Sequence, residues 1–159
     1  MPKYFPADRT ELKHIIKDEI RKNPKQPFLL NIDTSKVTDM TSLFINKKSI
    51  EILDLSTWDI SDIYSMNYMF YGCENLKELY LPDFDISAVR LTVNMFGKCN
   101  SLELDKIYTN DKRIKNIFLK CQADMKLNEN IQRFDVSDYG DNDIIDNHEI
   151  KSYVYNHRP

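Results

Sequence analysis

The sequence predicts an α/β solenoid of about four to five units of 22–26 residues, each contributing a short strand and a helical turn. Two residue types recur every 26 residues along the chain: a phenylalanine at Phe44, Phe70 and Phe96, and an Asp-x-Ser motif that begins at Asp33, Asp59 and Asp85. Each unit also contains two successive patterns of apolar residues, the first with the spacing of a strand and the second with that of a helix. Periods of 20–50 residues are typical of stacked units that bury their apolar faces only against their neighbours.

The first half of each unit is predicted to be a strand. Leu53 and Leu55 are separated by one residue, and Leu79 and Leu81 repeat the pattern 26 residues later. This alternation is the period of a strand that has one buried side.

The second half of each unit is predicted to be one or two helical turns. Val37, Met40, Leu43 and Phe44 follow the three- and four-residue spacing of one helical face. The serine of each Asp-x-Ser motif stands where a helix N-cap is expected; these are Ser35, Ser61 and Ser87. Gly72 and Gly97, just after the repeated phenylalanine, suit a left-handed helix stop.

One domain is predicted, with residues 1–27 as an N-terminal capping helix, 28–137 as the repeats and 138–159 as a C-terminal cap. The capping helix is expected over residues 8–22 with Thr10 as its N-cap, and a closing helix over 144–156. The fourth unit departs from the pattern. Its phenylalanine, Phe118, arrives only 22 residues after Phe96, and Asp105 falls where an apolar residue is expected.

The segments from Asp33 to Phe44 and from Trp58 to Phe70 resemble the BspA-like leucine-rich repeat, whose unit runs roughly W-D-[VI]-S-x-[VI]-x-x-M-x-x-M-F. The resemblance extends over about residues 4–137. It implies a leucine-rich-repeat fold and a binding role, often toward host or matrix proteins at a cell surface. It implies no shared catalytic activity.

No enzymatic site or cofactor is predicted. Three cysteines each lie three residues after a repeated phenylalanine, at Cys73, Cys99 and Cys121. Their spacing and odd number favour free thiols in the core over a metal site or a disulfide framework. The histidines are scattered at His14, His148 and His157, which indicates no catalytic triad.

One stretch has partial calcium-loop spacing. Its candidate ligands are Asp138, Asn142, Asp146 and Glu149. Gly140 stands where the loop has its second ligand, and Asp143 replaces the glycine of the sharp turn. A solvated acidic cap is therefore favoured over a divalent-ion site.

A partner-binding surface is predicted on the strand half of the units. Aligning the units by 26 residues gives three outward columns: Gln26, Ile52, Glu78 and Leu104; Phe28, Asp54, Tyr80 and Lys106; and Leu30, Ser56, Pro82 and Tyr108. The candidate contact residues are Phe28, Ile52, Asp54, Glu78, Tyr80, Lys106 and Tyr108, because mixed aromatic and charged side chains are typical of protein-binding surfaces. Alternatively, Phe28 and Ile52 pack under the N-terminal helix or against another copy.

The favoured function is a non-catalytic protein-interaction module, such as a small bacterial, phage or mobile-element inhibitor or immunity-type protein. The alternatives are a fragment of a cell-surface adhesin, and an inhibitor of a nucleic-acid-processing complex that acts through the acidic stretch 135–149 or the basic first helix. The sequence shows no apolar signal region and no membrane span, so a cytoplasmic location is expected, or a cell-surface one if the sequence is a fragment.

Overall fold

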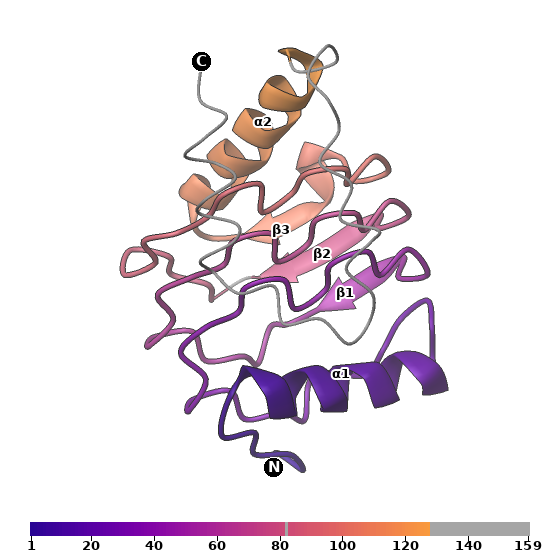
Figure 1. Ribbon diagram of the computed structural model, residues 1–159, viewed down its shortest axis with the longest axis vertical. Helices are drawn as coiled ribbons and strands as arrows, with labels where there is room; N and C mark the ends of the chain where they lie inside the picture. The colour runs from indigo at the N-terminus through magenta and orange to yellow at the C-terminus, as the bar shows by residue number, and fades with distance from the viewer. Residues whose placement is uncertain (82, 128–159) are drawn as a thin grey trace.

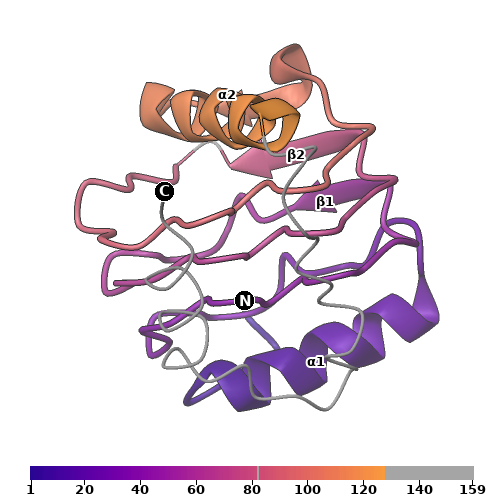
Figure 2. The same ribbon diagram turned by 45° about the horizontal axis from the view of Figure 1, so that its top comes forward.

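The computed structural model describes residues 1–81 and 83–127, which form a stack of rows closed by a helix at each end (Figures 1 and 2). The elements are α1 (Arg9–Lys22), β1 (Ile52–Asp54), β2 (Glu78–Leu81), the 3-10 helix η1 (Leu104–Lys106), β3 (Ile107–Thr109) and α2 (Lys112–Leu127). The three strands form a parallel sheet in the order β1-β2-β3.

The register of the sheet follows the sequence period for the first two strands and departs from it at the third. Asp54 pairs with Tyr80, 26 residues later, as the alignment predicts. Tyr80 then pairs with Tyr108, 28 residues later. The two additional residues fall in the segment of η1 that precedes β3. The predicted column that placed Lys106 beside Tyr80 is therefore wrong, and Tyr108 takes that position.

The half of each row that follows the Asp-x-Ser motif is not helical, contrary to the prediction. Alternate backbone N–H groups of one row donate to carbonyls of the next row, from Ser42 to Asn67 and from Phe44 to Met69, both at 2.9 Å. The next pair of rows repeats these bonds from Tyr68 to Val93. In a helix, these N–H groups would instead donate to carbonyls four residues earlier in the same row. The rows are thus bonded to one another on both sides of the stack.

Residues with positive φ explain why a helix does not form. They recur every 26 residues in two columns: Ser42, Tyr68 and Asn94, and Asn46, Gly72 and Lys98. A left-handed residue interrupts a right-handed helix and starts a new turn. Gly72 has the predicted left-handed conformation, with φ of 74°. Gly97 does not, and its role is close packing: a Cβ there would lie 2.6 Å from the Tyr71 ring.

The Asp-x-Ser motifs form turns rather than helix caps, which corrects the role predicted for Ser35, Ser61 and Ser87. In each row the aspartate carboxylate accepts the backbone N–H of the serine, at 3.0 Å for Asp33 and 2.9 Å for Asp59 and Asp85. The motif therefore marks a corner of each row.

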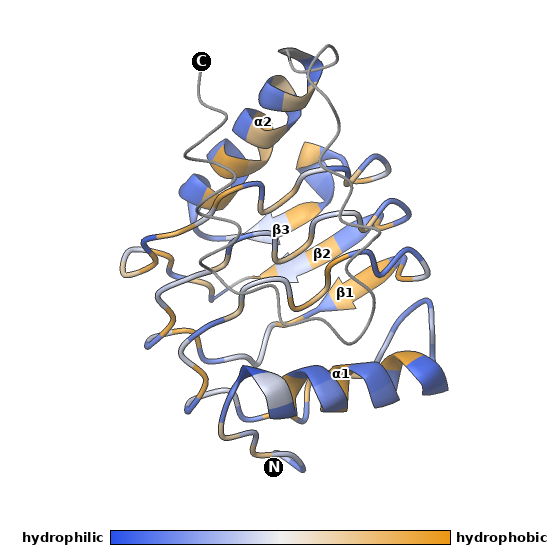
Figure 3. Cartoon of the chain, in the orientation of Figure 1, coloured by the Kyte–Doolittle hydropathy of each residue, from blue (hydrophilic) through white to orange (hydrophobic). Residues whose placement is uncertain are grey.

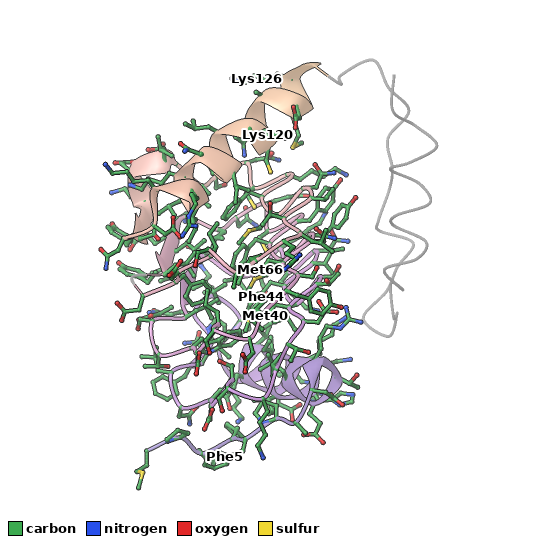
Figure 4. The ribbon with its side chains drawn as sticks, turned by 90° about the vertical axis from the view of Figure 1, so that its left-hand side faces the viewer. Phe5, Met40, Phe44, Met66, Lys120 and Lys126 are labelled. Carbon is green, nitrogen blue, oxygen red and sulfur yellow. The ribbon has the colours of Figure 1, made fainter. Side chains whose placement is uncertain are left out.

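The repeated phenylalanines form a stacked column in the core. Their rings lie 5.7 Å apart between Phe44 and Phe70 and 5.4 Å apart between Phe70 and Phe96, nearly parallel in both cases. All three are fully buried. Phe118, from α2, meets Phe96 edge-on at 5.7 Å. Figure 4 shows Phe44 with Met40 and Met66 inside the stack.

Helix α1 closes the first end of the stack. Its apolar residues Leu12 and Ile16 are buried, whereas most of its surface is hydrophilic (Figure 3). The N-cap is Asp8, whose carboxylate accepts the Glu11 N–H at 2.9 Å, so the predicted cap Thr10 is wrong. The Glu11 carboxylate in turn accepts the N–H of Ala7, the residue before the N-cap, at 2.8 Å.

Helix α2 closes the other end; the helical turns expected around Phe118 are part of it, but its length of 16 residues was not predicted. It begins at Lys112, inside the range expected for the fourth repeat, and buries Ile114, Phe118 and Cys121. The closing helix expected over 144–156, like the cap predicted for 138–159, lies outside the described residues.

The phenylalanine column yields a test of the packing. We expect Phe70→Ala to lower the free energy of unfolding by about 3–5 kcal/mol, because it removes a fully buried ring between two others. Urea denaturation measures this. Tyr64→Ala serves as the control, since Tyr64 is 42% exposed. Equal small losses for the two variants would contradict the stacked core.

Candidate partner-binding face

The outward residues of the strands form one surface over a buried layer of aliphatic side chains. Leu53, Leu79 and Ile107 are fully buried, one from each strand. The residues that alternate with them are half-buried or exposed, as the strand period requires. We call this surface the strand face and define it by Ile52, Asp54, Glu78, Tyr80, Lys106 and Tyr108.

A stacked tyrosine pair lies on the β2–β3 side of the strand face. The rings of Tyr80 and Tyr108 are 4.4 Å apart and 14° from parallel. Their strands place them directly opposite each other. Tyr108 is 38% exposed, and Tyr80, in register with it, is half-buried. The pair therefore offers a rigid aromatic surface outside the core.

Glu78 is oriented by this pair. The Tyr80 hydroxyl donates to Oε2 of Glu78 at 2.6 Å. Because ionising the phenol would break this bond and place a second negative charge beside the carboxylate, the hydrogen bond raises the pKa of Tyr80 to about 12. Tyr80 is therefore a neutral donor throughout the physiological range, and Glu78 keeps one fixed orientation.

The other predicted residues lie around the tyrosine pair. Asp54, in register with Tyr80, accepts the Ser56 N–H at 3.0 Å. Ile52 is half-buried beside it, and Lys106 is half-buried in η1. The structure thus brings six of the seven candidate residues onto three adjacent rows.

Phe28 lies in the row that precedes β1. It is 56% exposed, so it does not pack under α1 as the alternative interpretation proposed. It lines a hollow of about 440 Å³ together with Met1 and Leu30. Phe28 is therefore an exposed aromatic residue beside this hollow, at the first end of the stack.

A second hollow, of about 390 Å³, lies at the corner after β2 and β3. Three of its charged groups are ion-paired, because the Arg113 guanidinium contacts both Asp111 and Asp85. The hydrogen bonds from Arg113, together with the Ile86 N–H, lower the pKa of Asp111 to about 2. These interactions connect neighbouring rows and engage Asp85, Asp111 and Arg113 in structural contacts.

The cysteines lie in the core. Cys73 and Cys99 are buried free thiols whose Sγ atoms donate to the carbonyls of Phe44 and Phe70, at 3.0 and 3.1 Å. Burial raises the pKa of Cys73 to about 12 and that of Cys99 well above its usual value. Since the thiolate is the reactive form, both residues have a structural role.

Other predicted groups are distributed as follows. His14 is exposed on α1. The possible calcium ligands Asp138, Asn142, Asp146 and Glu149 lie outside the described residues. Within residues 1–81 and 83–127, no three His, Cys, Asp or Glu side chains are grouped to hold a metal ion. No helix in that same part of the chain has the length and apolarity to cross a membrane.

Sequence reasoning missed the Tyr80–Tyr108 stack. The strict 26-residue alignment placed Tyr108 two positions away from Tyr80. A signal was present in the sequence: shifting the last row by two residues puts Ile107 in the buried column of Leu79, where the strict alignment left Asp105.

Comparison with known proteins gives one family match. The family model described as "Mycoplasma protein of unknown function, DUF285" matches residues 11–134. This range includes α1 from Glu11 onward, the three strands, η1 and all of α2. Neither the curated proteins nor the solved structures include a significant match.

The Glu78–Tyr80 hydrogen bond predicts a specific titration. We expect Tyr80 to ionise near pH 12 and Glu78→Gln to lower its pKa, because the negative acceptor is removed. The folded pKa lies above the unfolded value of about 10, so this bond stabilises the fold fully below about pH 10 and loses its contribution as pH rises through about 12. Tyrosinate absorbance, with Tyr80→Phe to assign the signal, measures the titration.

Glu74→Gln is the matched control for that titration, because Glu74 pairs with Lys48 and not with a tyrosine. An unchanged Tyr80 titration in Glu78→Gln would show that the carboxylate does not hold the phenol.

The buried thiols predict protection from alkylation. We expect Cys73 and Cys99 to resist iodoacetamide in the folded protein and to react after unfolding in urea, since both are buried and have raised pKa values. Peptide mass spectrometry assigns the modified residues. Native-state alkylation at the unfolded rate would contradict their place in the core.

Proposed function

This chain belongs to the DUF285 family, and we propose that it is a BspA-like leucine-rich-repeat protein that binds another protein, without catalysis, through its strand face. The fold part of the proposal is supported by parallel strands at a 26-residue interval and by backbone bonds between rows on both sides of the stack. Each row buries its apolar residues against its neighbours, which is the construction expected of a solenoid.

The observation that carries the binding proposal is the Tyr80–Tyr108 pair. The core beneath it is already closed by Leu79 and Ile107, which are fully buried. The tyrosines therefore place aromatic area at the surface, where each also carries a hydroxyl. Tyrosine is enriched in protein interfaces because one side chain supplies both apolar area and a hydrogen bond.

The strand face is also preorganised. The backbone of Tyr80 is held between two neighbouring strands, its ring is stacked, and its hydroxyl is bound to Glu78. Binding therefore costs little side-chain entropy at these positions. Ile52 adds an apolar contact and Asp54 and Lys106 add charges beside the pair, a mixture of aromatic, apolar and charged side chains that suits a protein interface.

The non-catalytic part of the proposal rests on the state of the reactive groups. The thiols of Cys73 and Cys99 are buried and have raised pKa values. In the hollow after β2 and β3, Asp85 and Asp111 form ion pairs with Arg113. These groups contribute to the stability of the stack, and the strand face offers shape and hydrogen bonding.

The proposal predicts that the double variant Tyr80→Ala/Tyr108→Ala loses its partner. Truncating two central aromatic residues commonly costs at least about 2 kcal/mol of binding, or roughly 30-fold in affinity. Quantitative mass spectrometry of proteins captured from the native host by the tagged full chain measures the loss. Circular dichroism and the melting temperature verify that the variant remains folded.

Tyr64→Ala is the matched control, because Tyr64 has a similar exposure, 42%, and lies beside the bridge residue Ser65 on the turn side of the rows. We expect it to retain the captured partner. Equal capture by the folded double variant and the unsubstituted chain would reject the strand face as the binding surface.

A further inference from the structure

The outward side of α2 is a basic surface. Lys112, Lys120 and Lys126 are exposed and Lys115 is half-buried, while Ile114, Phe118 and Cys121 point into the stack. Figure 4 shows Lys120 and Lys126 on the helix at the end of the stack. We call the four lysines the α2 basic face. Asp124 is the helix's one acidic residue.

The lysines of the α2 basic face differ from three lysines that are ion-paired, Lys25, Lys48 and Lys77. In the rows, Lys25 and Lys77 each lie 2.7 Å from the Glu51 carboxylate, and Lys48 lies 2.9 Å from that of Glu74. Among the residues that the structure describes, no carboxylate lies within ion-pair distance of the four α2 lysines. The face is therefore an excess of positive charge on a chain whose net charge is −3.

A complementary segment lies in the same sequence. Residues 135–149 contain six acidic residues and no Lys or Arg. The stretch begins eight residues after Leu127, the last residue of α2. Eight extended residues span roughly 26–29 Å, and the 16 residues of α2 rise about 24 Å. The linker is thus long enough to bring Asp135 to any turn of α2.

We propose that the α2 basic face is the docking site for the acidic stretch 135–149 of the same chain. Each exposed ion pair is weak on its own and is screened by salt. The short linker compensates, because it holds the stretch at a high effective concentration beside the helix. Several weak pairs then act together, and the contact opens as ionic strength rises. This docking site is at the end of the stack and is separate from the strand face.

Zero-length carbodiimide cross-linking of the full chain tests the proposal, because it joins a lysine to a carboxylate only when the two are in contact. We expect peptides that link α2 lysines to residues 135–149 at low salt. We expect these links to disappear near 1 M salt, where the screening length is about 3 Å. Because each substitution also removes a reactive amine, the informative variant is K112Q/K115Q, which should weaken the links that remain at Lys120 and Lys126, with its fold verified by circular dichroism.

The matched control is K17Q/K36Q, which removes two lysines from α1 and the rows and should keep the links at Lys120 and Lys126 unchanged. Absence of α2 links, links that persist unchanged near 1 M salt, or links from 135–149 chiefly to lysines outside α2 would overturn the proposal. An equal mixture of isotopically labelled and unlabelled chains gives links within one isotope if the docking is intramolecular. Mixed-isotope links would assign the occupant to a second copy and also overturn it.

Discussion

The 26-residue register between rows is the constraint on which the rest of the structure depends. The rings of Phe44, Phe70 and Phe96 stack because each row repeats the same path one level higher. The left-handed positions and the aspartate corners repeat at the same interval. Each row lacks a core of its own, so the burial of one phenylalanine requires its neighbours to be in place.

This register also decides which residues can contact a partner. Along a strand, alternate side chains point to opposite sides, so a slip of one residue would bury Tyr80 and expose Leu79. The helices α1 and α2 cover the two ends of the stack. The sheet side is left with an outward surface whose tyrosines are fixed by strand pairing. The strand face is thus a consequence of the same bonds that stabilise the fold.

The sequence predicted the structure correctly where a residue pattern is compatible with only one backbone conformation. Leu53 and Leu79 alternate as only a strand does, and the recurring Phe70 is buried as its period predicts. The spacing of Met40, Leu43 and Phe44 had two solutions, since consecutive turns with left-handed residues such as Ser42 reproduce helical spacing. Four candidate-site residues pair as the predicted columns required, Ile52 with Glu78 and Asp54 with Tyr80. Tyr108 does not, because two additional residues in its row shift the register.

Scalar couplings across hydrogen bonds test the register most directly. We expect couplings from the amide nitrogens of Ser42 and Phe44 to the carbonyl carbons of Asn67 and Met69, and from Tyr68 to Val93. These would place successive rows side by side at the observed interval. Couplings from the same amides to carbonyls four residues earlier in their own row would instead reveal helices, and would contradict both the stack and the surface derived from it.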